Sequence, residues 1–124
     1  MMKSMQQKAD IRTILTEAKK NSGRTQAEII AWSEGSFTRS TWYKALKGQA
    51  SDERMICMFM AVLAPAALFD KYCRACGISI SDEYEGGRLL RSYITKHDRR
   101  YDVLDINAIL VNAGQPPIIK TKAA

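Results

Sequence analysis

The sequence of 124 residues has few of the residue types that carry out chemistry, with a single histidine, His97. Nucleophilic catalysis needs a nucleophile, a base and an orienting group. His97 stands among the charged residues of 96–100, and a histidine in such a setting is expected on the surface, in contact with solvent. The sequence offers no catalytic residue, and we expect a protein that is not an enzyme.

Long apolar runs are also lacking. The longest uncharged stretch, residues 55–69, is interrupted by Pro65 and is shorter than the roughly 20 residues that cross a bilayer. The first ten residues are polar and lack the apolar segment of a signal peptide. We therefore expect a soluble, cytoplasmic protein with no membrane partner.

Three cysteines are too few, and odd in number, for a framework of paired disulfides. Cys73 and Cys76 have the Cys-x-x-Cys spacing of some metal and redox sites, but Cys57 and His97 are the only other thiol and imidazole. Apolar side chains recur at helical spacing in Phe69, Tyr72, Cys73 and Cys76. We expect these thiols in the core, with no metal and no cofactor, and keep a redox or metal sensor as a weaker alternative.

The net charge of +6 is unevenly distributed along the chain. Residues 1–50 hold nine Lys or Arg against four Asp or Glu, whereas residues 51–124 hold ten against nine. A basic N-terminal half followed by a nearly neutral C-terminal half is typical of a protein that turns one surface toward phosphates.

The pattern of caps and apolar spacing predicts an all-α fold in a single domain, with no strand pair and no glycine-rich phosphate loop. A first helix is expected to start near Asp10, and Ser51 and Asp102 are expected to cap later helices. The body of the helix after Ser51, residues 55–63, is apolar all round and methionine-rich, which favours a central core helix over an oligomer seam. We expect a bundle of about five helices over 10–76, two C-terminal helices over 77–119, and a flexible tail over 120–124.

Residues 25–48 predict two short helices around a glycine turn. Thr25 can cap the first helix, Gly35 can adopt positive φ, and Ser36 or Thr38 can cap the second. The inward positions of the second helix are Trp42, Ala45 and Leu46. Its outward positions are Arg39, Ser40, Tyr43 and Lys44. A short polar helix braced by a partner helix suits a DNA major groove.

This segment resembles the helix-turn-helix of the phage-repressor (lambda-repressor-like) family of DNA-binding regulators. The matching residues are Thr25, Gln26, Gly35, Phe37, Thr38, Arg39, Ser40, Thr41, Trp42, Lys47 and Gly48. The resemblance implies that Gln26 braces a backbone phosphate and that a recognition helix over about 38–47 reads bases. The base contacts are then expected from Thr38, Arg39, Ser40 and Tyr43. Lys44 and Lys47 are expected to contact phosphates. In the last third, Gly77 and residues 88–93 and 101–110 resemble the helical tail of some small regulators of this kind. Asn107 is expected to cap or brace a neighbouring backbone group, which is a structural role.

We therefore expect a sequence-specific, double-stranded DNA-binding transcriptional regulator. A single module of this size buries little surface, so useful specificity implies a homodimer on a two-fold site. The chain departs from the family in Ile30, where a small residue is usual, and in a longer turn. The alternative is a protein–protein interaction module without specific DNA binding, which would use Ile30, the long turn and the methionine-rich helix.

Overall fold

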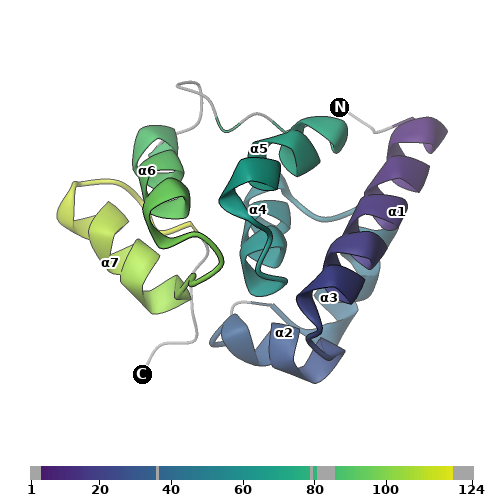
Figure 1. Ribbon diagram of the computed structural model, residues 1–124, viewed down its shortest axis with the longest axis horizontal. Helices are drawn as coiled ribbons and strands as arrows, with labels where there is room; N and C mark the ends of the chain where they lie inside the picture. Colours follow the sequence, from purple (N-terminus) through teal and green to yellow (C-terminus); the bar gives the residue numbers. More distant parts are fainter. Residues whose placement is uncertain (1–3, 36, 79, 81–85, 119–124) are drawn as a thin grey trace.

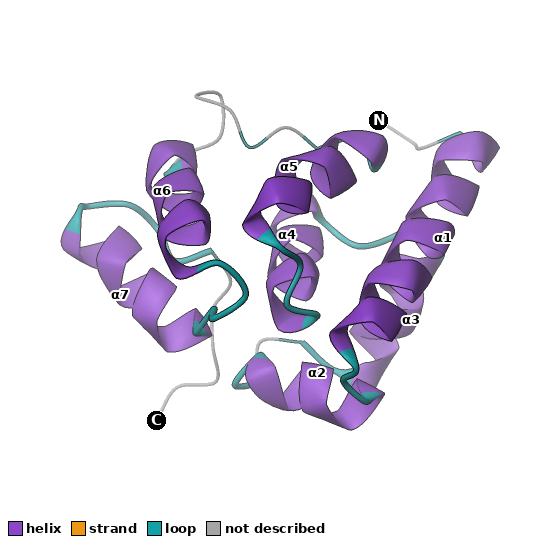
Figure 2. Ribbon diagram, in the orientation of Figure 1, coloured by secondary structure: helices purple, strands orange, loops and turns teal. Residues whose placement is uncertain are grey.

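The computed structural model describes residues 4–35, 37–78, 80 and 86–118, and these residues form helices and no strand (Figures 1 and 2). The helices are α1 (Met5–Ser22), α2 (Gln26–Trp32), α3 (Arg39–Leu46), α4 (Asp52–Ala61), α5 (Ala66–Ala75), α6 (Gly87–His97) and α7 (Val103–Asn112). The prediction of an all-α fold is confirmed. The expected tail over 120–124 and the candidate cap Ser36 lie outside the described residues.

Polar side chains cap the helices where the sequence predicted them. The side chains of Thr25, Thr38, Ser51 and Asp102 accept hydrogen bonds from backbone N–H groups in the first turns of α2, α3, α4 and α7. Each cap satisfies a donor that the helix itself leaves unpaired. Local sequence therefore sets these boundaries.

The start of α1 differs from the prediction. The helix begins at Met5, five residues before Asp10, because Ser4 forms a capping box with Gln7. The Gln7 N–H donates to Ser4 Oγ at 3.1 Å, and the Ser4 N–H donates to Gln7 Oε1 at 2.9 Å. The first turn is thus held by hydrogen bonds rather than by burial, as Met5 is 88% exposed.

Helix α4 is the centre of the hydrophobic core. Every residue from Met55 to Ala61 is at most 1% exposed, and α2 and α5 pack directly against the helix (Figure 1). The prediction of a central core helix is confirmed. The methionines Met55, Met58 and Met60 therefore cannot form a seam with another molecule.

The thiols belong to the same core. Cys57, Cys73 and Cys76 are fully buried, as the apolar spacing predicted for the last two. Burial raises the pKa of the Cys57 and Cys73 thiols above the ordinary value and keeps them protonated. A buried, protonated thiol is a poor nucleophile and metal ligand, which weakens the redox or metal-sensor alternative.

The C-terminal helices are attached to the rest by hydrogen bonds at the link between α6 and α7. The indole Nε1–H of Trp32 donates to the Tyr101 carbonyl at 2.7 Å. The Tyr101 hydroxyl donates to the Ala64 carbonyl at 2.6 Å, and the Ala66 N–H donates to Asp98 Oδ1 at 2.8 Å. These bonds fix the α6–α7 link against the end of α2 and the junction of α4 with α5.

Two side chains near α7 test predictions about the last third of the chain. Asn107 Oδ1 accepts a hydrogen bond from the Ile118 N–H at 2.9 Å, which confirms that Asn107 braces backbone. His97 lies at the surface among exposed charged residues, as expected, with its side chain 30% exposed. Its ring also stacks on Tyr93 with centroids 3.9 Å apart, and Nε2 lies 3.7 Å from Asp105 Oδ2. Helix α7, which returns alongside α6, thus covers part of this side chain.

The central position of α4 predicts a large cost for shortening its side chains. Phe59 is fully buried and contacts the rings of Phe69 and Tyr72 at centroid distances of 6.0 and 5.7 Å. We expect Phe59→Ala to lower the free energy of unfolding by about 3–5 kcal/mol, measured by urea denaturation. Leu104→Ala, at a side chain that is 51% exposed, should cost less than about 1 kcal/mol. Equal losses would contradict the assignment of α4 to the core.

Burial also raises the pKa of Tyr101 above its ordinary value of 10.0. The pKa of Tyr101 is therefore higher in the folded state than in the unfolded state. The contribution of the protonated hydroxyl to stability is complete below the unfolded-state pKa and is lost as the pH rises through the folded-state pKa. We expect the free energy of unfolding to fall above a pH of about 10, and less steeply in Tyr101→Phe. An unchanged slope in that variant would show that the Tyr101 hydroxyl is not protected in the folded state.

Candidate nucleic-acid interface

Helix α3 is held in place by its apolar face, which packs on α1. Trp42 is 3% exposed, Ala45 is fully buried and Leu46 is partly buried against the core. The predicted inward positions of this helix are therefore confirmed. The same packing fixes which residues must face outward.

The opposite face of α3 is polar and open to solvent. Arg39, Ser40, Tyr43, Lys44 and Lys47 are all exposed, with Tyr43 50% exposed. Within the part of the chain that the structure describes, no acidic side chain forms an ion pair with the Arg or either Lys. These three positive charges remain available to an anionic partner.

Thr38 differs from its neighbours on α3. Its hydroxyl caps the helix, lying 3.4 Å from the Thr41 N–H that donates to it and 3.3 Å from Thr41 Oγ1. The residue is exposed, but its oxygen is committed to the helix terminus. The sequence named Thr38 as a candidate cap of this helix, and the structure confirms that role; the resemblance also placed it near a base edge.

The turn between α2 and α3 is held by one buried polar side chain that the sequence analysis missed. Ser33 is fully buried, and its hydroxyl lies 2.6 Å from the Ile30 carbonyl and 3.3 Å from the Phe37 carbonyl. Gly35 has the predicted positive φ, 84°, and Glu34 also has positive φ, 51°. Residues 33–35 therefore form a defined turn at the end of α2.

A hollow of about 460 Å³ lies where α1, α2 and α3 meet. It is lined by Thr16, Lys19, Lys20, Gln26, Trp42, Tyr43 and Leu46. The hollow joins Gln26, the predicted phosphate contact, to Tyr43 on the exposed face of α3. Residues that are far apart in the sequence thus form one concave surface.

The amide of Gln26 is the most informative group in this hollow. Its Nε2 is buried and has no hydrogen-bond partner among the described residues. A buried donor without an acceptor is costly, so most such groups are paired in folded proteins. An oxygen atom of a bound anion would supply the missing acceptor.

Lys19 and Lys20 complete the hollow and were not among the predicted site residues. In the sequence, both lysines contribute to the excess of positive charge over residues 1–50 and suit the negative C-terminal end of the first helix. Arg24, a third nearby cation in the sequence, has another task, because its Nη1 donates to the Ala61 carbonyl at 3.2 Å, at the end of α4. The structure therefore separates two cations that line the site from one that supports the fold.

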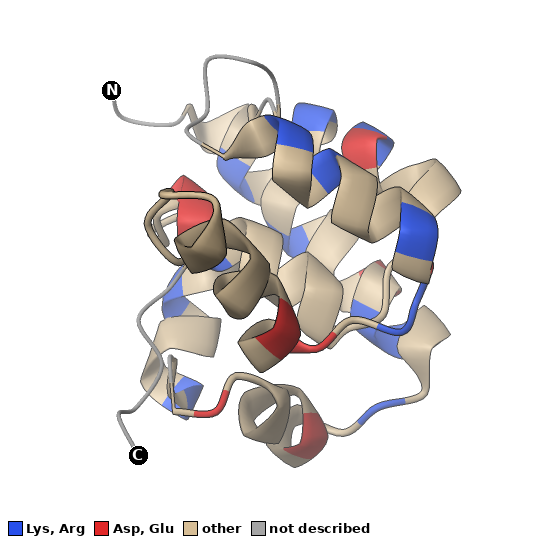
Figure 3. Cartoon of the chain, turned by 90° about the vertical axis from the view of Figure 1, so that its left-hand side faces the viewer, with Lys and Arg blue, Asp and Glu red and all other residues tan. Residues whose placement is uncertain are grey.

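Positive charge is present at both ends of the molecule. Helix α7 contains no Lys or Arg, and it lies at the opposite end of the molecule from α1 and α3 (Figure 1). Beside it, however, α6 and the α6–α7 link carry Arg88, Arg91, Lys96, Arg99 and Arg100, and Figure 3, which views this side, shows Lys and Arg on it. The candidate interface is therefore marked by the cations that gather with Gln26 around α1 and α3, not by a lack of positive charge elsewhere.

Comparison of the chain with known protein families, curated proteins and solved structures finds no significant match. Among the described residues, no group of three or more His, Cys, Asp or Glu side chains is placed so that it could hold a metal ion. None of the described helices has the length and apolar character needed to cross a membrane.

The unpartnered amide leads to a prediction about stability. We expect Gln26→Met to change the free energy of unfolding by less than about 1 kcal/mol, because Gln26 Nε2 gives up no hydrogen bond to the protein. Thr25→Ala, one residue earlier, should cost about 1 kcal/mol because it removes the cap of α2. A loss at Gln26→Met that exceeds the loss at Thr25→Ala would show that the amide serves the fold instead.

Proposed function

We propose that the protein is a sequence-specific, double-stranded DNA-binding transcriptional regulator that places α3 in the major groove. The observation that carries this proposal is the hollow beside α3, where the buried, unpartnered Nε2 of Gln26 lies with Lys19 and Lys20. A DNA phosphate would accept a hydrogen bond from the amide and be neutralised by the lysines.

The exposed face of α3 supports a division of roles. Arg39 is the candidate for a guanine contact, since a guanidinium can donate two hydrogen bonds to one guanine edge. Ser40 and Tyr43 would lie at or near other base edges. Thr38, whose hydroxyl caps α3, would present its methyl group, which can contact a thymine methyl.

Phosphate contacts would hold this helix in register. Gln26, Lys44 and Lys47 are proposed for this role from the sequence, and the lining of the hollow adds Lys19 and Lys20. Such contacts contribute affinity without sequence information. The proposal includes a homodimer, because one small module gives too little buried surface for useful specificity.

The alternative of a protein–protein interaction module has less support. One of the three features proposed for it, the methionines of α4, is buried, and a second, Ile30, packs partly buried against the core. The unpartnered amide and the uncompensated cations favour an anionic partner over an apolar one.

The proposal is tested by selecting random duplex DNA on the wild-type protein and on Arg39→Ala. We expect the wild type to enrich a two-fold-symmetric motif. In Arg39→Ala, the base preference should be relaxed at one or more positions of this motif, with a loss of about 1–3 kcal/mol of binding free energy for the preferred base. Arg100→Ala, an exposed arginine between α6 and α7, is the matched control and should leave the motif unchanged. Weak binding with no enriched motif in any of the three proteins would overturn the proposal.

The same binding assay at increasing salt separates the two classes of contact. Each phosphate contact adds about one unit to the slope of log affinity against log salt. Lys19→Gln and Lys20→Gln should each lower this slope while leaving the enriched motif intact. Lys96→Gln, at an exposed lysine of α6, provides the control for general loss of charge.

A further inference from the structure

Helix α7 exposes aliphatic side chains on a side that does not pack in the core. Leu104 is 51% exposed and Val111 is 55% exposed, and Ala108, between them in the sequence, is also exposed. Their spacing of i, i+4 and i+7 places these three residues, the α7 face, within about 60° of one another around the helix axis. The buried residues of α7 lie on another side of the helix and are Val103, Ile106 and Leu110.

Other exposed aliphatic residues of the described chain stand alone. Met5 lies in the first turn of α1, and Leu68, which is 36% exposed, lies on α5. Single apolar residues are ordinary on a protein surface, whereas several that share one face mark a site of interaction. The α7 face is therefore the surface to explain.

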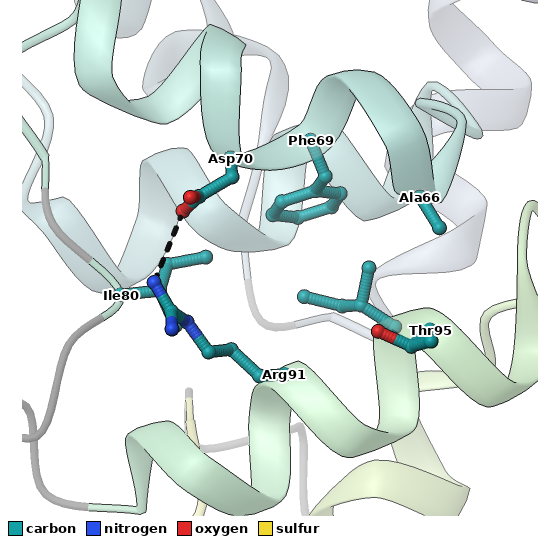
Figure 4. Close-up of a pocket in the computed structure, with 7 residues that line it drawn as sticks. Ala66, Phe69, Asp70, Ile80, Arg91 and Thr95 are labelled. Carbon is teal, nitrogen blue, oxygen red and sulfur yellow. Dashed lines mark ion pairs between the residues drawn. The ribbon is translucent and has the colours of Figure 1, made fainter.

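The α7 face is held in a fixed position at the edge of the molecule (Figure 1). Helix α7 packs on α6, and α6 packs on α5, where Phe69 of α5 and Ile94 of α6 belong to the same hydrophobic core. Arg91 of α6 reaches toward Asp70 of α5, with Nη2 and Oδ1 3.6 Å apart (Figure 4). A partner can thus dock on α7 without a rearrangement of the helices beneath it.

Charge favours α7 as a contact between two copies of the chain. Each copy has a net charge of +6, so two copies repel one another and meet most readily where a surface carries no cation. Of the described helices, α2 and α7 contain no Lys or Arg, and of these two only α7 exposes large aliphatic side chains. The cations at this end of the molecule belong to α6 and the α6–α7 link, beside the α7 face and not within it.

We propose that two copies of the chain form a homodimer through the α7 face, with the two α7 helices antiparallel about a two-fold axis near Ala108. A two-fold contact joins the same surface of both copies, so this surface must be complementary to itself. In the antiparallel arrangement, Leu104 packs against the partner subunit's Val111, and Ala108 meets the partner subunit's Ala108. The small side chain at the centre allows the helix axes to approach closely.

This contact supplies the homodimer of the proposed DNA-binding function and rests on that function to this extent. Helices α7 and α3 lie at opposite ends of the molecule (Figure 1), so the contact leaves the exposed face of α3 uncovered. One helix from each copy buries less surface than a standard interface of roughly 1,600 Å². We therefore expect a weak dimer, with Kd between about 1 and 100 μM.

The test is sedimentation equilibrium of the full-length protein without DNA, at concentrations from about 1 to 500 μM. We expect a monomer–dimer equilibrium that does not weaken as salt is raised, because salt screens the repulsion between two cationic molecules. A protein that stays monomeric over this range would overturn the proposal. Assembly that continues beyond two copies would also overturn it, because a two-fold contact closes at the dimer.

Charges introduced at Ala108 test the two-fold axis. Ala108→Glu and Ala108→Lys each place two like charges face to face, and each should weaken self-association by about tenfold or more. An equimolar mixture of the two variants places opposite charges face to face. This mixture should form a heterodimer about tenfold or more tighter than the dimer of either variant alone. A mixture that associates as weakly as its components would contradict the two-fold arrangement.

Two further variants control for loss of apolar surface and for added charge. Leu104→Ser should weaken the dimer by about tenfold or more without adding a charge. Met5→Glu changes an exposed apolar residue of α1 and should associate as the wild type does. A dimer that survives Leu104→Ser and both Ala108 variants would place the contact elsewhere and overturn the proposal.

Circular dichroism checks that each variant is folded. Ala108 is exposed, and Glu and Lys are good helix formers, so the Ala108 variants should retain the fold. Because no DNA is present, the two proposals can fail separately. A monomeric protein that still enriches a DNA motif would overturn only the α7 contact, whereas a dimer through α7 that enriches no motif would overturn only the DNA-binding function.

Discussion

The burial of α4 is the constraint on which the rest of the structure depends. A helix without a polar face must be covered on all sides, and residues from Met55 to Ala61 meet this condition. α2 and α5 pack on it directly, and the hydrophobic cluster extends from it into α1, α6 and α7. The candidate DNA interface lies one layer further out, because α3 packs on α1 and is left with its other face outward.

Most of the fold could be predicted because its signals are local. The caps Thr25, Thr38, Ser51 and Asp102 act on residues two or three positions away, and the apolar spacing of each helix spans only two turns. The start of α1 was misplaced because its first turn is held by the Ser4–Gln7 capping box, ahead of the first buried position at Ile11.

The candidate site could be predicted only in part. Helical spacing was enough to place Arg39 and Tyr43 on the exposed side of α3, because their orientation follows from the burial of Trp42. The hollow joins Lys19, Gln26 and Tyr43 from three helices, so it depends on how those helices cross, which spacing does not determine. The approach of His97 to Asp105 was not predicted for the same reason, since Asp105 lies on α7.

The hydrogen bond from Trp32 to Tyr101 has a consequence for the order in which the chain can fold during synthesis. The two residues are 69 positions apart. The Ala64 carbonyl likewise accepts a hydrogen bond from the Tyr101 hydroxyl, which lies 37 positions later in the chain. As the chain leaves the ribosome from its N-terminus, α1 to α5 emerge while these polar groups still lack their partners. The native contacts at the end of α2 are therefore completed only when the α6–α7 link has been synthesised. The helix pair formed by α2 and α3 thus reaches its final set of contacts late.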